Sequence, residues 1–189
     1  DLKLNATEKI DYISLKFKES KDYIDSKNYD SLIDNIQVLI DNHDFSKAIS
    51  EADNLDSILS SAIDKEPELE FKFPQDLVAQ EWNKASLEIS NIGSINLKDI
   101  RLDFDGFKQR GTFLFGDIKA GSHGTSIGGI LPEDPGSLQI KVKISYQSHK
   151  GEGHIDLDEW LDISRPGTIQ QEVKQEIKVT KTNSNLGTE

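Results

Sequence analysis

The stretch LQIKVKISY, residues 138 to 146, decides the fold class of this chain. Its apolar residues stand at every second position, and Gln, Lys or Ser stand between them. A period of two is typical of a β-strand that buries one face and exposes the other to water. The stretch therefore predicts a long strand over an apolar core.

Shorter alternations of the same kind lie on both sides of it, at residues 69–73, 87–90, 100–104 and 155–163. Turn signals rich in Gly, Pro, Asn and Asp separate them, at residues 91–93, 105–106, 120–121, 132–136 and 150–153. About seven short strands without intervening helices predict an antiparallel β-sandwich over residues 67–163.

Before residue 67 the apolar spacing is helical. Ile10, Ile13 and Phe17 recur three to four residues apart, and the same spacing continues to Ile63. It predicts three antiparallel helices, near residues 6–25, 29–41 and 45–64, in a helical segment over residues 1–66. Pro67 ends this segment, because proline disfavours helix in the residue before it. The predicted fold class is α+β, with helices and strands segregated along the chain.

Two stretches of the helical segment echo each other. NYDSLI, residues 28–33, is matched sixteen residues later by DFSKAI, residues 44–49. In each a polar residue precedes an aromatic one, and two apolar residues follow. The pattern resembles the turn of tetratricopeptide-like helical hairpins. The 34-residue period of those repeats is missing, so the resemblance implies a hairpin-like segment only.

Residues 74–163 resemble a known family of sandwiches. The residues that carry the resemblance are LEISNIG (87–93), LKDIRL (97–102), GDIKAG (116–121) and the Pro135-Gly136 pair before the long strand. They are similar to the immunoglobulin-like domains grouped as CARDB, archaeal cell-adhesion-related modules. The resemblance implies a cysteine-free immunoglobulin-like sandwich of archaeal type that serves as a spacer, docking surface or adhesion module. It brings no catalytic signature.

The last segment, residues 164–189, begins with a strong stop at Arg165-Pro166-Gly167. Ile169, Val173 and Ile177 then recur every four residues, which fits a short amphipathic helix or an extended connector equally well. The residues after them are polar. We expect this segment to be a linker or a partly disordered tail.

Composition limits the partners. The 189 residues carry a net charge of −12, which argues against a nucleic-acid partner. There is no cysteine, so disulfides and thiolate metal sites are excluded. No run approaches the roughly 20 apolar residues that cross a bilayer, so no membrane insertion is expected here. The chain starts at Asp1 and has no methionine, so we expect it to be a piece of a longer protein. That protein is expected in the cytoplasm or, if it carries a secretion signal, at the cell surface.

The pattern GTSIG, residues 124–128, matches the G-x-S-x-G nucleophile elbow of serine hydrolases. In such an elbow a strand turns directly into a helix. The residues from this pattern to Pro132 do not favour a helix. A hydrolase would also need an acid and a base near this serine, for which Asp134 and either His149 or His154 are the candidates. No feature positions them near Ser126, so we predict a Gly-rich edge strand and no catalytic residue.

The other polar patterns fit structural roles better than chemical ones. The glycines at 121, 124, 128 and 129 lack the Lys of a phosphate-binding loop. His154, Asp156 and Asp158 share one strand face, and Asp103 with Asp105 precedes a glycine; both patterns predict a solvated face or a turn rather than a metal site. The histidines 43, 123 and 149 are expected in exposed loops. No metal and no cofactor is predicted.

Trp82 and Trp160 are expected to pack in a core or between the two halves. Taken together, these patterns predict a non-catalytic protein-interaction or scaffold segment with an unidentified protein partner. The partner would be a peptide along a sandwich edge or a helix in a groove between helices. The alternative is an extracellular adhesion or carbohydrate-binding module of a surface protein.

Overall fold

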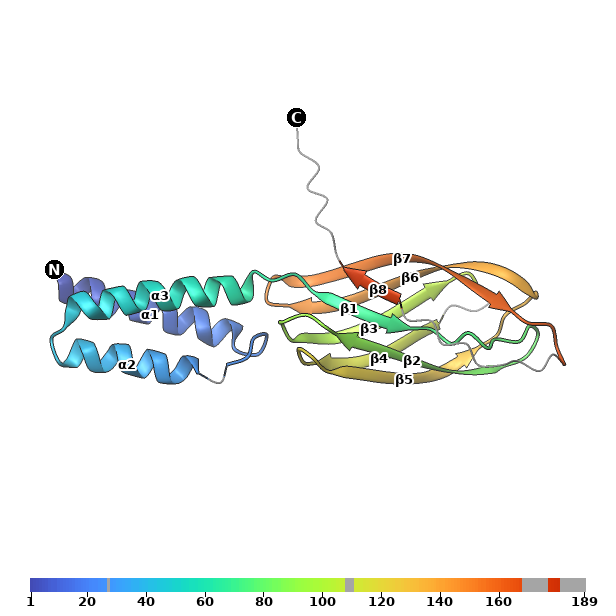
Figure 1. The fold of residues 1–189 in the computed structure, drawn as a ribbon, viewed down its shortest axis with the longest axis horizontal. Helices are drawn as coiled ribbons and strands as arrows, with labels where there is room; N and C mark the ends of the chain where they lie inside the picture. Colours follow the sequence, from blue (N-terminus) through green and yellow to red (C-terminus); the bar gives the residue numbers. More distant parts are fainter. Residues whose placement is uncertain (27, 108–110, 168–176, 181–189) are drawn as a thin grey trace, which may run out of the picture. The chain divides into compact units, whose positions relative to one another are not determined.

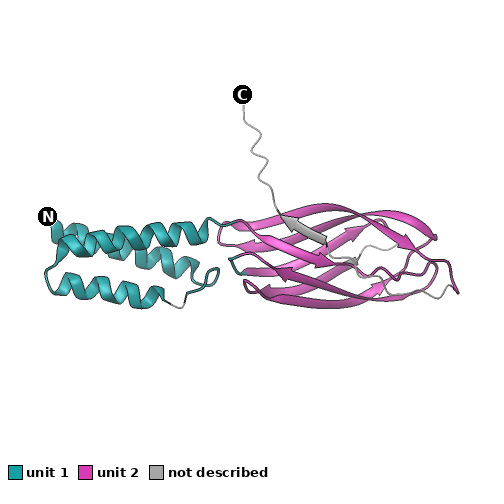
Figure 2. Ribbon diagram, in the orientation of Figure 1, with its two compact units in different colours: residues 1–65, 94–96 teal, residues 66–93, 97–189 magenta. Residues whose placement is uncertain are grey.

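The structure is a computed structural model that describes residues 1–26, 28–107, 111–167 and 177–180. Its contacts divide the chain into two compact units (Figure 2). The helical unit consists of Asp1–Lys65 and Ser94–Asn96, and the sandwich unit of Glu66–Gly93 and Leu97–Glu189. None of the described helices is long and apolar enough to cross a membrane.

The helical unit contains the three predicted helices, α1 (Leu2–Ser20), α2 (Tyr29–Asp41) and α3 (Phe45–Ile63) (Figure 1). α1 lies nearer the N-terminus than predicted. Asp1 caps it by accepting a hydrogen bond from the Lys3 amide at 3.0 Å. Its end was missed because Ile24 keeps the apolar spacing and is buried, although the chain has already left the helix.

The two echoed stretches mark the starts of α2 and α3. Asn28 and Asp44 are the N-cap residues, and Tyr29 and Phe45 are the first residues of the helices. Both aromatic rings are partly buried against the helical core, and the Tyr29 ring stacks on Phe17 with centroids 5.3 Å apart. The echo is therefore a repeated way of starting a helix and wedging it against its neighbours.

The sandwich unit consists of two antiparallel sheets, so the immunoglobulin-like α+β fold is confirmed (Figure 1). One sheet has the order β5-β2-β1-β8, and the other has the order β4-β3-β6-β7. The strands are β1 (Glu68–Lys72), β2 (Asn83–Asn91), β3 (Leu97–Asp105), β4 (Gly111–Ile118), β5 (His123–Ile130), β6 (Gly136–Ser148), β7 (Gly151–Ile163) and β8 (Ile177–Thr180).

The stretch LQIKVKISY forms most of β6, which lies between β3 and β7. Ile140, Val142 and Ile144 are buried, while Lys141 and Lys143 are exposed, as the alternation predicts. β6 and β7 form a hairpin whose thirteen residue pairs run without a register shift from Gly136↔Ile163 to the tight turn at Ser148↔Gly151. This hairpin is the longest paired unit of the sandwich.

Two strands were not predicted as such. β4 was hidden because its pattern is irregular: Gly116 has a φ of +70°, and the pairing of β3 with β4 shifts register twice between Leu97 and Arg101. β8 pairs with β1 and lies in the segment expected to be a linker. Its sequence, IKVT, alternates like a strand but is only four residues long. Ile169 and Val173 lie outside the described residues.

Asn91 and Gly93, in the LEISNIG stretch that ends β2, have structural roles. The Asn91 side chain is fully buried, donates a hydrogen bond to the Ile118 carbonyl at 3.2 Å and accepts one from the Gly93 amide at 3.2 Å. A Cβ atom on Gly93 would lie 3.1 Å from the Glu68 amide nitrogen. Asn91 therefore links the two sheets at this turn, and Gly93 lets the turn pass close to β1.

Candidate functional site

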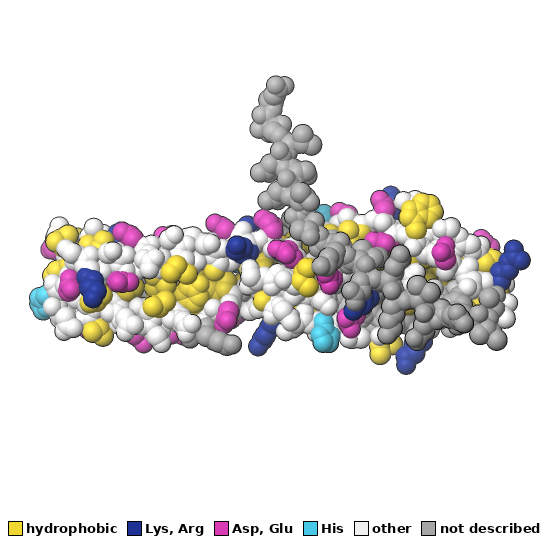
Figure 3. Space-filling model, in the orientation of Figure 1, with side chains coloured by type: hydrophobic (Ala, Val, Ile, Leu, Met, Phe, Trp, Pro, Cys, Tyr) yellow, Lys and Arg dark blue, Asp and Glu magenta, His cyan; other side chains and the backbone are white. Residues whose placement is uncertain are grey.

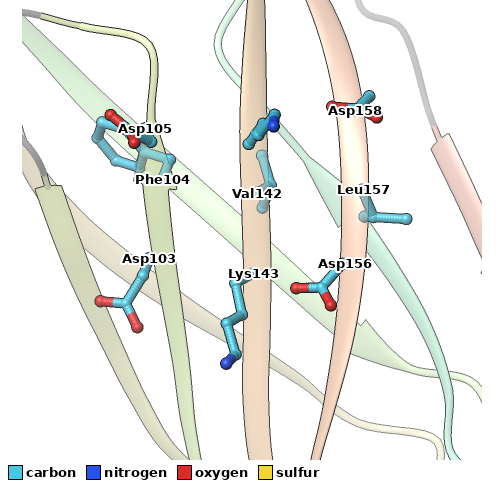
Figure 4. A pocket seen from close by; sticks show the side chains of 9 residues that line it. Asp103, Phe104, Asp105, Val142, Lys143, Asp156, Leu157 and Asp158 are labelled. Atoms are coloured by element: carbon cyan, nitrogen blue, oxygen red, sulfur yellow. The ribbon is translucent and has the colours of Figure 1, made fainter.

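The outer face of the β4-β3-β6-β7 sheet carries three columns of charge. Lys141 on β6 stands opposite Asp105 on β3 and Asp158 on β7, and Lys143 stands opposite Asp103 and Asp156. These side chains surround a shallow hollow of about 510 Å³ (Figure 4). Directly opposite residues of neighbouring strands approach within about 5 Å at their Cβ atoms, so each lysine stands between two carboxylates in the register of the sheet.

This arrangement accounts for the pattern that resembled a metal site. His154, Asp156 and Asp158 do share the outer face of β7, and all three are exposed. Opposite Asp156 and Asp158 on β6 stand two lysines, which repel a cation where further ligands would be needed. His154 Nε2 lies 3.2 Å from Asp156 Oδ2. Within the described ranges, no three His, Asp or Glu side chains gather in a metal-binding arrangement.

The second acidic pattern is also engaged in the sheet. Asp103 accepts a hydrogen bond from Thr112 Oγ1 at 2.6 Å and forms an ion pair with Arg101 Nε at 3.2 Å. Asp105 Oδ1 accepts from the Gly106 amide at 3.0 Å, and Gly106 has a φ of +125°. Asp105-Gly106 thus begins a turn, as predicted.

Ser126 is not in a nucleophile elbow. It lies within β5 opposite Leu87, and the chain continues extended to Ile130 without entering a helix. Asp134 precedes β6 and His149 follows it, so the thirteen residues of that strand hold them roughly 40 Å apart. His154 lies on the outer face of the other sheet. The residues nominated as acid and base are therefore not assembled around this serine.

The glycines of β5 are explained by packing. A Cβ atom on Gly124 would lie 2.8 Å from Ile118 Cδ1, and one on Gly128 would lie 2.6 Å from Phe113 Cε1. On the opposite face of the strand, a Cβ on Gly129 would lie 3.0 Å from Trp82 Cε3. A side chain at Gly124 or Gly128 would therefore displace a neighbouring group, whereas at Gly129 the exposed Trp82 ring would have to shift only slightly.

Both tryptophans contradict their predicted burial. Trp82 is 63% exposed and Trp160 is 62% exposed. Trp160 continues the outward positions of β7 after Asp158 and stands opposite Gln139. The strand alternation predicts this outward position, whereas the general preference of tryptophan for buried sites points the other way. Two exposed indole rings are therefore available to partners.

The helical unit has an apolar groove between α2 and α3. Its volume is about 420 Å³, and its lining includes Leu32, Val38 and Leu39 from α2 with Leu55 and Ile58 from α3. Figure 3 shows hydrophobic side chains gathered on the helical unit. Figure 1 shows the helices of this unit. Leu32 is 40% exposed, Val38 53% and Ile58 45%.

A second hollow continues the groove. It shares Ile58 with the first and extends along Tyr29 of α2 and Ala62 of α3. Polar but uncharged side chains, Asn35 and Asn54, also line the first part. A groove between helices was expected as a possible docking place for a helix, but its residues were not predicted. They could have been found from α2, whose apolar residues cover more than one face.

No protein-family model matches the chain, and no curated protein matches it. Among solved structures, the chain is similar to the CARDB domain of a Pyrococcus furiosus protein in complex with di-metal ions. The identity is 12%, the match covers 52% of this chain and 88% of that one, and the TM-score is 0.33.

The chain is also similar to murine CRIg. This match has 12% identity, covers 53% of this chain and 98% of that one, and has a TM-score of 0.27. Similarities of this size identify no ligand or partner.

Proposed function

We propose that this chain is a protein-interaction module whose helical unit binds one amphipathic helix of a partner protein between α2 and α3. The exposed second apolar face of α2 carries the proposal. Of the thirteen residues of α2, only Ile36 and Ile40 are buried, whereas Leu32 and Val38 remain exposed. An apolar helix face without a covering element favours association with another helix.

The dimensions of the groove set the length of the partner. Its lining residues on α3 run from Lys47 to Ala62. At 1.5 Å per residue this stretch is about 22 Å long, which corresponds to about four helical turns. A partner helix of about fifteen residues, with apolar side chains at positions i, i+3, i+4 and i+7, would cover it.

Charge specifies the outer face of that helix. Residues 1–66 contain eight Lys against fifteen Asp or Glu, a net charge of −7. A partner rich in Lys or Arg beside its apolar stripe is therefore attracted, and an acidic one is repelled. Asn35 and Asn54 in the lining offer hydrogen bonds that do not depend on the sign of the partner's charge.

A displayed library of fifteen-residue amphipathic helices tests this proposal. Peptides selected on the whole chain are measured against Ile58→Glu and against the control Leu15→Glu, whose α1 residue is 56% exposed and outside the groove lining. We expect basic peptides to be selected and Ile58→Glu to weaken their binding at least tenfold. Failure to select peptides, or equal loss of affinity in both variants, would contradict the proposal.

Trp160 favours a second candidate function, carbohydrate binding. Its exposed ring lies on β7 opposite Gln139 and next to the outward positions of Asp158 and Asp162. An exposed indole beside amide and carboxylate groups can stack on a sugar ring and bond its hydroxyls. A glycan array compared between the wild-type chain and Trp160→Ala distinguishes this function, because Ile58→Glu would leave it unchanged.

A further inference from the structure

β5 is an edge strand of its sheet and carries few of the sequence features that usually protect such an edge. Among the described residues, β2 is its only sheet neighbour. From Gly124 to Ile130 it contains no charged residue and no proline. A strand edge exposes backbone N–H and C=O groups that pair readily with another strand, and proteins commonly block this with charges, prolines or bulges.

The other sheet protects both of its edge strands. On β7, Glu159 occupies an inward position between Leu157 and Leu161, which discourages pairing at that edge. β4 has irregular register against β3 and carries Asp117. Charged or irregular positions thus occur on the edge strands β4 and β7, whereas β5 has no charged residue from Gly124 to Ile130.

Two exposed apolar side chains accompany the open edge. Trp82 lies against Gly129 on the outer face of β5, and Ile127, two residues earlier in the strand, faces the same side. Ile127 is 62% exposed and Trp82 63%. A strand added to this edge would cover both, which adds apolar burial to the backbone hydrogen bonds.

We propose that the added strand is β5 of a second copy of this chain, paired antiparallel about a twofold axis. In such an interface residue i of one copy contacts residue j of the other and the reverse, so the strand must be complementary to itself. The uncharged stretch from Gly124 to Ile130 meets this requirement, because no like charges come opposite each other.

The position of Ile127 strengthens the choice of a second copy. It lies near the middle of β5, which spans His123–Ile130, so a symmetric pairing brings the two Ile127 side chains close to the axis. Trp82, over Gly129, then lies near the strand of the partner copy. The two four-stranded sheets become one continuous sheet.

Oligomeric state tests this inference. Sedimentation equilibrium of the whole chain over a wide concentration range is expected to show a dimer. Ile127→Lys places two ammonium groups near the axis and should give a monomer. Leu114→Lys is the matched control, because Leu114 is 69% exposed on β4, an edge of the other sheet, and should leave the dimer intact. Circular dichroism verifies that both variants fold.

Tryptophan fluorescence gives a second readout. In a Trp160→Phe background, emission of Trp82 should shift to the blue and become less accessible to iodide as the dimer forms. A chain that stays monomeric at every concentration overturns the inference. So does a dimer that survives Ile127→Lys or leaves Trp82 emission unchanged, since it would use another surface. Neither result bears on peptide binding at Ile58, which tests the helical groove separately.

Discussion

The two units distribute their apolar side chains in different ways. In the sandwich, the strand period sends every second side chain of β6 inward, and the outward positions carry Lys141 and Lys143 between aspartates. In the helical unit, α2 keeps Leu32 and Val38 exposed. A strand has only two faces, and the facing sheet covers one of them. A helix in a three-helix unit has several faces, so one of them remains available to a partner.

Core substitutions should give the largest effects and show that both units are equally well packed inside. Leu102 in β3 and Leu59 in α3 have no exposed surface, and replacing either with Ala should lower the free energy of unfolding by about 3 kcal/mol. Leu32→Ala and Leu114→Ala should cost less, about 1 kcal/mol or below, because Leu32 is 40% and Leu114 69% exposed. Urea denaturation followed by circular dichroism measures all four. Equal costs for Leu32 and Leu59 would abolish the contrast between core and groove.

Gly128→Ala should destabilise the sandwich by about 1–3 kcal/mol, because the added methyl group meets the Phe113 ring. Gly129→Ala is the comparison, since the ring it meets belongs to the exposed Trp82 and can move away. Thermal denaturation of both variants, and of Gly128→Ala combined with Phe113→Leu, measures the effect. If Phe113→Leu does not restore stability to Gly128→Ala, the loss does not come from the contact between the added methyl group and the Phe113 ring.

Lys143→Glu should lower the free energy of unfolding by up to about 1 kcal/mol, because it places a third carboxylate between Asp103 and Asp156. Salt should reduce this cost, since the face is exposed to water. Urea denaturation at low and high salt makes the measurement. A cost that does not depend on salt would mean that packing of the lysine stem, rather than charge, stabilises this face.

Glu159→Gln should have the smallest effect, below about 0.5 kcal/mol. Burial raises the pKa of the Glu159 carboxyl, so the folded state binds its proton more readily than the unfolded state. Stability from this group is present below the unfolded pKa, near 4.3, and is lost as the pH rises through the folded pKa. The variant should therefore be more stable than the wild type at neutral pH but not at acidic pH. Thermal denaturation at the two pH values measures this difference.

The fold was predictable because its signals are local. The spacing of Ile10, Ile13 and Phe17 and the alternation in β6 each follow from one element and its neighbours. β4 was not predictable in this way, because its bulged pairing with β3 breaks the alternation. The groove and the open edge depend on which faces remain uncovered after the elements pack. For Trp160 the alternation was correct, and the preference of its residue type was misleading.

The β6–β7 hairpin has a consequence for the order of folding. Its thirteen residue pairs can form one after another, starting at the tight turn. Each new pair therefore costs little additional chain entropy. Pairing of β2 with β5 instead joins residues far apart in the sequence, such as Asn83 and Ile130. Contacts between nearby residues form faster than distant ones. We therefore expect the hairpin to be structured in the transition state, while β5 docks late and its edge is among the last parts of the sandwich to form.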